Sequence, residues 1–341
     1  MHYLSHDRLR QLLEKLTSSY SVFVPVEDGS GLQYVPYTSD LEHFDPGQVR
    51  AFEPLKLFFQ RAREVVAQDY DTDLPGQDKK PVCVVGAKAC DLKGFKVLDH
   101  ALLKGEYEDP FYKRNRERNL IISCDCTTAL DTCFCMAMGV KPFPEEAFDI
   151  NLSPVEGGYL VEAGSKKGEA LLEASSGILG EPDQDMMAER GRTRNQVAEL
   201  VQANIEESGV PDRKSLEGAV RRMYDSEVWA DEARTCVECG ACNTICPTCH
   251  CFLLYDQKNE GKMERLRIWD SCLLKGFARV GGGDNPRPEL WMRLRNRFEK
   301  KFDFFPEVAN VYACTGCGRC ITGCPAKIDI REVLGRLVSN G

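Results

Sequence analysis

The sequence predicts an α/β domain over residues 1–165, a helical connector over residues 166–230 and a cysteine-rich module over residues 231–341. Three observations support this division. In the first part, short apolar runs typical of buried strands alternate with helical patterns. The middle part is polar, charged and rich in helix-forming residues. Most of the 17 cysteines lie in the last part, within and around two runs of the same spacing.

The first part begins with a charged amphipathic pattern over residues 2–16, in which leucines recur at helical spacing. We expect short strands at residues 21–26 and 32–36. A second helix is predicted to open at residues 52–59. This mixture of helices and short strands is typical of an α/β domain.

Two more apolar runs, residues 81–86 and 119–123, have the character of buried strands. A turn and a helix start, residues 87–95, lie between them. The order strand–helix–strand predicts a parallel pair, and cysteines follow the carboxyl end of each strand. Open α/β sheets bind ligands at this edge.

The pattern then changes to a hairpin and to helices. Residues 146–164 predict a hairpin that turns at Gly157 and Gly158. The connector is predicted to contain helices at residues 192–207 and 214–224, whose charge runs we expect to be solvated faces.

The cysteine-rich module contains the pattern C-x2-C-x2-C-x3-C-P twice. This is the ligand spacing of a ferredoxin with [4Fe-4S] clusters, in which the fourth cysteine of each run ligates the other cluster. We therefore predict a first set, Cys236, Cys239, Cys242 and Cys324, and a second set, Cys314, Cys317, Cys320 and Cys246. Gly240 and Gly318 hold the same place in both runs. Because glycine has no Cβ, we expect backbone N–H groups to approach the sulfurs there.

Other uses of these cysteines fit the pattern less well. Structural zinc uses C-x2-C pairs but needs only four ligands per ion. Disulfides would require an oxidising compartment, and no secretory signal is visible. No run reaches the roughly 18 apolar residues of a membrane helix, so we expect no membrane insertion. The net charge of −9 argues against a nucleic-acid partner. We expect a cytoplasmic protein whose cysteines bind metal.

A third set of cysteines follows the two buried strands: Cys90, Cys126, Cys133 and Cys135, with Cys124 as an alternative to Cys126. Four thiolates at neighbouring strand ends have the ligand count of a third cluster. The same residues could instead bind zinc or be inert buried thiols. Cys83 lies within a strand, and we expect it to be structural.

Residues 252–313 separate the two cysteine runs, a longer link than in a small ferredoxin. The glycine run at residues 281–283 is not a phosphate loop, because no G-K-[ST] follows it. A basic helix is predicted at residues 290–302, packed on one side and with a solvated or docking face on the other.

Three cysteines remain outside these sets: Cys249, Cys251 and Cys272. They could bind a further cluster if a fourth ligand joined them. They could equally be buried thiols beside the other sets, and the spacing does not decide between these alternatives.

The chain resembles a known family along nearly its whole length. The stretches that carry the resemblance are P-L-K-L-F-F from residue 54, A-C-D-L-K-G around Cys90, D-P-F-Y from Asp109, C-T-T-A-L-D-T-C-F-C-M-A-M-G from Cys126, C-P-T-C-H-C-F from Cys246, W-D-S-C from Trp269, G-G-D-N-P-R from Gly282 and C-T-G-C-G-R-C from Cys314. The family is that of [4Fe-4S] dicluster electron-transfer subunits. It is typified by the beta subunit of cytoplasmic sulfhydrogenase and the corresponding iron–sulfur subunit of anaerobic sulfite reductase, with similar subunits in flavin oxidoreductase–heterodisulfide reductase complexes.

The resemblance implies a mainly α-helical ferredoxin module with two [4Fe-4S] clusters after the α/β domain. It also supports the pairing of Cys90, Cys126, Cys133 and Cys135. It implies a flavoprotein partner that carries FAD and uses NAD(P)H or ferredoxin. A hydrogenase, a sulfite reductase or a heterodisulfide-reductase-like core would be the catalytic partner.

The residues themselves contain no G-x-G-x-x-G, no P-loop and no G-x-S-x-G elbow. We therefore expect an electron-transfer subunit of an anaerobic redox complex rather than a catalytic one. One alternative is a catalytic subunit whose N-terminal domain itself binds flavin or substrate. Another is a redox sensor in which loss of a cluster changes a binding surface.

Overall fold

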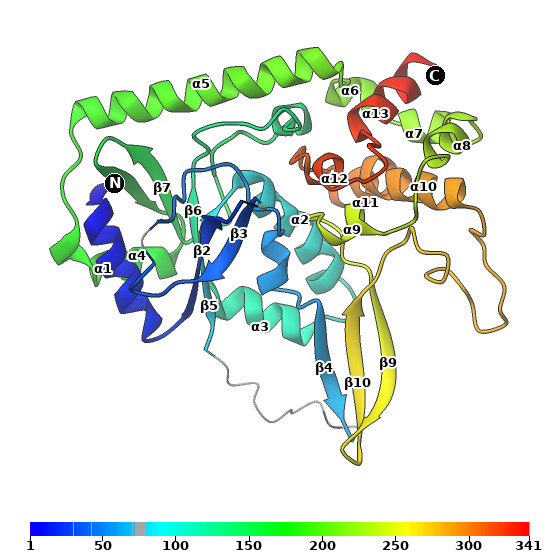
Figure 1. The fold of residues 1–341 in the computed structure, drawn as a ribbon, viewed down its shortest axis with the longest axis horizontal. Helices are drawn as coiled ribbons and strands as arrows, with labels where there is room; N and C mark the ends of the chain where they lie inside the picture. The colour runs from blue at the N-terminus through cyan, green and yellow to red at the C-terminus, as the bar shows by residue number, and fades with distance from the viewer. Residues whose placement is uncertain (30, 42, 70, 72–79, 341) are drawn as a thin grey trace.

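The computed structural model describes residues 1–29, 31–41, 43–69, 71 and 80–340. A mixed sheet of seven strands, in the order β1-β8-β7-β6-β5-β2-β3, forms the N-terminal part (Figure 1). Its strands are β1 (His2–Ser5), β2 (Ser21–Glu27), β3 (Leu32–Pro36), β5 (Val82–Ala87), β6 (Leu120–Cys124), β7 (Ile150–Val155) and β8 (Gly158–Ala163). The four central strands run parallel, and the outer pairs β2–β3, β7–β8 and β8–β1 are antiparallel. The expected α/β architecture is present in this part, including the parallel pair β5–β6 and the β7–β8 hairpin.

The prediction of a helix from residue 2 is wrong for its first residues. Residues 2–5 form β1, in which Tyr3 pairs with Leu160 of β8. Helix α1 (His6–Thr17) begins after Ser5, whose Oγ accepts a hydrogen bond from the Arg8 backbone N–H at 3.4 Å. The leucines of the amphipathic pattern are buried against the sheet. The strand depends on a partner more than 150 residues away, which local periodicity does not reveal.

Helices cover both faces of the sheet. In β5, Cys83 and Val85 pack with the leucines of α1, whereas Val84 and Ala87 pack on the other face. Helix α2 (Ala89–Leu103) and helix α3 (Pro110–Arg118) cover that second face. Burial on both sides explains why β5 and β6 are almost entirely apolar. Cys83 is part of this apolar core, as expected.

A second, three-stranded sheet joins distant parts of the chain. Strands β9 (Phe252–Asn259) and β10 (Lys262–Trp269) form a hairpin between the two cysteine runs, and β10 also pairs with β4 (Arg63–Gln68). The sequence did not predict these strands, so the expectation of a mainly helical C-terminal module needs this correction. The predicted helix at residues 52–59 is a short 3-10 turn, η1 (Leu55–Phe58).

The connector is dominated by one long helix. It comprises α4 (Lys166–Glu173), η3 (Ser176–Ile178), α5 (Gln184–Ser208), α6 (Arg213–Leu216) and α7 (Ala219–Arg222). Helix α5 runs along the top of Figure 1 from the sheet toward the C-terminal helices. It also holds the loop after β6, because Arg194 binds Asp125 at 2.7 Å and Asn204 donates to the Leu130 carbonyl at 2.7 Å.

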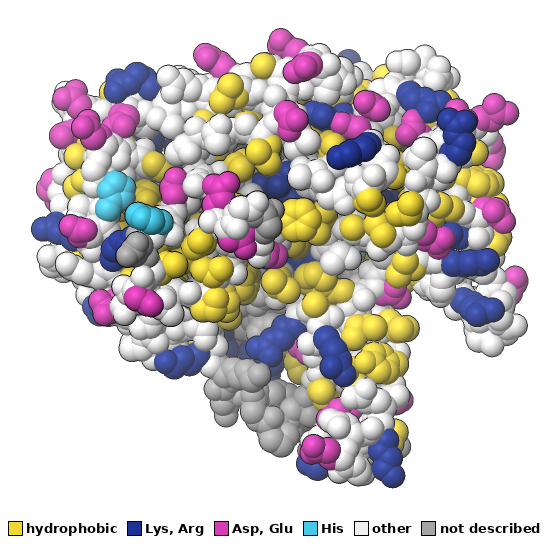
Figure 2. Space-filling view, in the orientation of Figure 1, with side chains coloured by type: hydrophobic (Ala, Val, Ile, Leu, Met, Phe, Trp, Pro, Cys, Tyr) yellow, Lys and Arg dark blue, Asp and Glu magenta, His cyan; other side chains and the backbone are white. Residues whose placement is uncertain are grey.

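The C-terminal part is otherwise helical. Its helices are α8 (Val228–Ala233), α9 (Ala241–Thr244), α10 (Leu290–Glu299), the π-helical η4 (Lys300–Phe304), α11 (Phe305–Ala309), α12 (Arg319–Thr322) and α13 (Ile330–Ser339). Trp229, Phe298, Phe302 and Leu334 form the centre of its core. No helix in the described ranges is long and apolar enough to cross a bilayer. Basic and acidic side chains are interspersed over the face in Figure 2.

Candidate iron–sulfur sites

The structure gathers the first set around one cavity. Cys236, Cys239 and Cys242 come from the loop and short helix that begin this run, and Cys324 comes from the end of the other run. All four line the same cavity, together with apolar side chains such as Phe298. This cavity has the donor set that a [4Fe-4S] cluster requires. Cys239 is exposed, so the first set lies next to solvent.

The second set repeats this arrangement deeper in the protein. Burial, together with the neighbouring thiols of Cys320 and Cys246, raises the pKa of Cys314 to about 12. Cys246 is likewise an electrostatic neighbour of Cys320. The fourth cysteine of the first run therefore lies with the second run, which supports the crossed pairing. Thiols with raised pKa values need iron or nearby cations to be held as thiolates.

The third set is brought together at the carboxyl edge of the sheet. Cys90 lies at the start of α2 and Cys126 follows β6. Burial raises the pKa of Cys135, and Cys126 and Cys133 add to the effect, so these thiols are neighbours. Burial raises the pKa of Cys90, and the thiol of Cys126 adds to the effect.

Cys124, the alternative ligand, faces elsewhere. It is fully buried and packs in the apolar core between the sheet and α1. Cys126 lies beyond the strand end, where burial and the thiol of Cys133 raise its pKa to about 11. This placement favours Cys126 as the ligand.

The second and third sets adjoin each other through close backbone packing. The Phe134 N–H donates to the Gly316 carbonyl at 2.8 Å. A Cβ on Gly318, whose φ is +71°, would lie 2.3 Å from the Thr132 carbonyl oxygen. The expected reason for this glycine is the approach of N–H groups to sulfur. The left-handed backbone and the neighbouring chain give a second reason why glycine is required there.

A shared cavity and shared hydrogen-bond partners place the three sets in series. Cys320 of the second set lines the cavity of the first set together with Cys242. Arg50 donates both to the Cys317 carbonyl of the second set and to Thr132 Oγ1, next to Cys133 of the third. The second set is therefore the middle one.

The remaining cysteines gather around the side chain of Asn243. Its Nδ2 donates to Cys272 Sγ at 3.1 Å, and Cys249 Sγ donates to its Oδ1 at 3.6 Å. A hydrogen bond from Cys251 lowers the pKa of Cys272 to about 6. Among the described residues, no three His, Cys, Asp or Glu side chains converge closely enough to hold a single metal ion. This differs from the compact cage of a mononuclear zinc site.

Buried cations surround the first and second sets. Arg297 lines the cavity of the first set and donates to Asn243 Oδ1 at 2.9 Å. Lys301 donates to Cys246 Sγ at 3.3 Å, and Lys56 donates to the Cys249 carbonyl at 2.7 Å. Burial would lower the pKa of Lys301, but Cys246 and Cys249 raise it overall, so the ammonium form is favoured.

The prediction that the basic helix has a solvated face is wrong for these residues. Arg293, Arg295 and Arg297 of α10 are buried, as is Lys301. Arg293 pairs with Glu238 at 2.8 Å, and Arg295 lies over the Tyr224 ring at 3.5 Å. The spacing of basic residues along a helix does not distinguish a solvated face from one that meets buried thiols.

A further cation lies where the second and third sets meet. Arg319 follows Gly318 and is fully buried. It pairs with Asp91 at 2.8 Å, and Asp91 in turn follows Cys90. Arg50 donates to the Cys317 carbonyl. The contact between the second and third sets therefore contains a buried ion pair. Arg319 and Asp91 lie in two of the stretches that carry the resemblance, C-T-G-C-G-R-C and A-C-D-L-K-G, but nothing in the sequence predicts that they pair.

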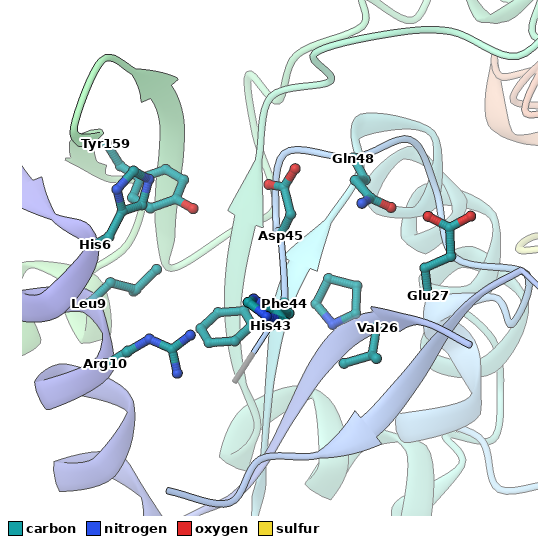
Figure 3. A pocket seen from close by; sticks show the side chains of 11 residues that line it. His6, Leu9, Arg10, Val26, Glu27, His43, Phe44, Asp45, Gln48 and Tyr159 are labelled. Atoms are coloured by element: carbon teal, nitrogen blue, oxygen red, sulfur yellow. The ribbon is translucent and has the colours of Figure 1, made fainter. Parts of the chain in front are cut away.

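The N-terminal part also has a pocket of about 400 Å³. His6 and Tyr159 lie on one side of it and Asp45 and Gln48 on the other (Figure 3). Lys88 Nζ donates to the Pro46 carbonyl, next to Asp45, at 2.6 Å and to the Asp125 carbonyl, next to Cys126, at 3.2 Å. The loop that carries Asp45 therefore packs near the third set. No sequence pattern points to the pocket, because its residues are widely separated.

Comparison with known proteins agrees with the cysteine geometry. Residues 235–328 match a family described as "4Fe-4S dicluster domain". This part of the chain is a 4Fe-4S dicluster domain. It includes both cysteine runs and the β9–β10 hairpin between them.

The similarity extends beyond the dicluster domain. The chain is 29% identical over 328 residues to Sulfhydrogenase 2 subunit beta of Pyrococcus furiosus, which covers 95% of this chain and 94% of that protein. The resemblance seen in the sequence is confirmed: the chain is similar over most of its length to a sulfhydrogenase subunit, and its C-terminal part matches a 4Fe-4S dicluster domain.

Proposed function

We propose that this chain is the electron-relay subunit of a cytoplasmic, anaerobic multi-subunit redox complex. The observation that carries the proposal is the serial arrangement of three cysteine sets, the first beside solvent and the second in the middle. A [4Fe-4S] cluster supplies one-electron transfer without a change of protein bonds. The protein's own residues position such groups, shield them from water and balance their charge.

Each set would hold one cluster through its four cysteines. The first two sets match the ferredoxin spacing, and the third adds Cys90, Cys126, Cys133 and Cys135. A cluster with four thiolate ligands is an anion, and Lys301 and Arg297 offer buried positive charge beside the first and second sets. The donors and the charges therefore fit iron–sulfur clusters.

Electrons would enter from one partner and leave to another. A flavoprotein with FAD, linked to NAD(P)H or ferredoxin, is the proposed first partner. A hydrogenase, a sulfite reductase or a heterodisulfide-reductase-like core is the proposed second. The similarity to a protein named as a sulfhydrogenase subunit supports this assignment. The exposed Cys239 makes the first set a suitable point of exchange with one of them.

Metal analysis of the anaerobically purified chain tests the proposal. We expect about twelve irons and as many acid-labile sulfides, or about eight if the third set binds no cluster. Reduction by dithionite should give EPR signals of [4Fe-4S] clusters. Zinc or no metal at the two ferredoxin-type sets would refute the relay function.

The pocket beside α1 supports a second candidate, a catalytic subunit that binds flavin or substrate in its N-terminal part. Its volume of about 400 Å³ lies in the usual range for small-molecule sites. A purified chain that carries flavin absorbance, or that alone oxidises NAD(P)H with a dye acceptor, would favour this candidate. A chain with clusters but neither property would favour the relay.

A further inference from the structure

Lys301 has surroundings that differ from those of the other cations near the cysteine sets. Its Nζ contacts Cys246 Sγ at 3.3 Å and is held in place by Thr248 Oγ1 at 3.0 Å and the Ala313 carbonyl at 2.8 Å. Its side chain is 4% exposed. Within the part of the chain that the structure describes, no carboxylate lies at ion-pair distance from it. Its charge therefore acts on sulfur without being cancelled locally.

The neighbouring cations have other partners. The guanidinium of Arg297 contacts the Asn243 amide and the Cys242 carbonyl, and it also hydrogen-bonds the Cys320 thiol of the second set. Arg319 is neutralised by Asp91 at 2.8 Å. Helix α10 and its π-helical continuation thus place Arg297 at the cavity of the first set and Lys301, four residues later, at a ligand of the second. Irregular π-helical turns are often found at functional sites.

Charge and burial have opposite effects on a cluster in the second set. Reduction adds one negative charge to a group that is already an anion, and a buried position disfavours that charge. A nearby cation favours it, and the attraction is strong where water is excluded. Because the second set is the middle one, its cluster must be reducible if electrons are to pass between the first and third sets.

We propose that Lys301 raises the reduction potential of the cluster in the second set and so keeps the middle of the relay able to accept an electron. This inference rests on the proposed function. Lys301 is a positioning and charge-balancing residue, and it exchanges no electron or proton itself. The reaction concerned is the uptake of one electron from an external reductant, with no protein bond made or broken.

An anaerobic redox titration of the full chain, monitored by EPR with a viologen mediator, tests the proposal. Lys301→Gln removes the charge but keeps a hydrogen-bond donor. We expect the equilibrium constant for reduction of the second-set cluster to fall about tenfold. This corresponds to a reduction potential that is lower by about 59 mV for a one-electron step. The signal of this cluster is identified by its absence from the Cys317→Ser variant. Lys301→Arg, which retains the charge, should behave like the wild type.

The matched control is Lys258→Gln, which makes the same charge change at an exposed position on β9. The proposal would be overturned if the reduction potential of the second-set cluster fell no further in Lys301→Gln than in this control. It would also be overturned if the decrease were confined to the cluster of the first or third set. If Lys301→Gln binds no iron, Lys301→Met, which also removes the charge, is compared with the control in its place. Iron content is measured on each sample, so that absence of clusters from the wild type refutes the relay function, whereas unchanged potentials refute only the role of Lys301.

Discussion

At the residue scale, the placement of Cys124 and Cys126 decides how the third set is composed. Cys124 is enclosed by the apolar core, whereas Cys126 adjoins Cys133. The sequence could name both thiols but could not choose between them, because a C-x-C pair at a strand end leaves open which cysteine points into the core. In a continued strand, residues 124 and 126 would share one face. The structure resolves the choice because β6 ends at Cys124, so the chain is free to direct Cys126 away from the core that holds Ile122 and Cys124.

Cys133→Ser should therefore remove one cluster, about four irons, and leave the two ferredoxin-type signals. Iron analysis and EPR of the anaerobic protein measure this. The control is Cys124→Ala, which changes a thiol in the same region but should retain all iron. Unchanged iron in Cys133→Ser, or loss of iron in Cys124→Ala, would contradict the assignment of the third set.

The crossed pairing of the two ferredoxin runs makes a second prediction. Cys246→Ser should damage the cluster of Cys314, Cys317 and Cys320, although Cys246 is far from them in sequence. Cys324→Ser should damage the first set in the same way. The signals of both variants are compared by EPR. If Cys246→Ser instead removes the signal of the first set, each run holds its own cluster and the pairing is wrong.

At the scale of elements, backbone packing between the loop at Thr132 and the turn before α12 holds the third set against the second. Gly318→Ala should disturb this contact, because a Cβ would lie 2.3 Å from the Thr132 carbonyl oxygen. The left-handed backbone alone costs about 1–2 kcal/mol for alanine. We expect a lower thermal midpoint and an altered signal of the third cluster.

Gly276→Ala is the control for this substitution, because nothing lies within 4 Å of the Cβ that would be added. It should leave the midpoint nearly unchanged. Equal effects of the two substitutions would show that the contact at Gly318 has no special role in stability.

Elements with a strong local pattern could be predicted from the sequence, and those that depend on distant partners could not. The apolar runs of β5 and β6 and the glycine turn of the β7–β8 hairpin gave clear signals. Strand β9 is mostly exposed and β10 mixes charged with apolar residues, so neither shows a clean alternation. The cysteine spacing identified the first and second sets, but the inward direction of Arg297 and Lys301 follows only from tertiary packing.

At the scale of the whole molecule, the β4–β10–β9 sheet joins the N-terminal part to the dicluster domain. Arg267 of β10 is 3% exposed and pairs with both Glu64 of β4 and Asp109. Arg267→Met would leave these two carboxylates without their buried partner. We expect a loss of about 3–5 kcal/mol in the free energy of unfolding. Chemical denaturation under anaerobic conditions measures it.

Arg265→Met on the same strand is the matched control. Its side chain is 53% exposed and pairs with Asp256 at the surface. Exposed pairs contribute about 0–1 kcal/mol, so this variant should stay close to the wild type. A similar loss of unfolding free energy in both variants would mean that Arg267 does not hold the N-terminal part and the dicluster domain together.

The contact between Phe134 and Gly316 also has a consequence for the order of assembly. A ribosome releases Cys90, Cys126, Cys133 and Cys135 long before it makes the glycine turn that closes over them. Until the turn at Gly316 has been synthesised, one side of their site is open. Their thiols are then accessible to the cellular source of iron and sulfide. We expect this site to be the easiest to load on the nascent chain and the hardest to refill once synthesis is complete.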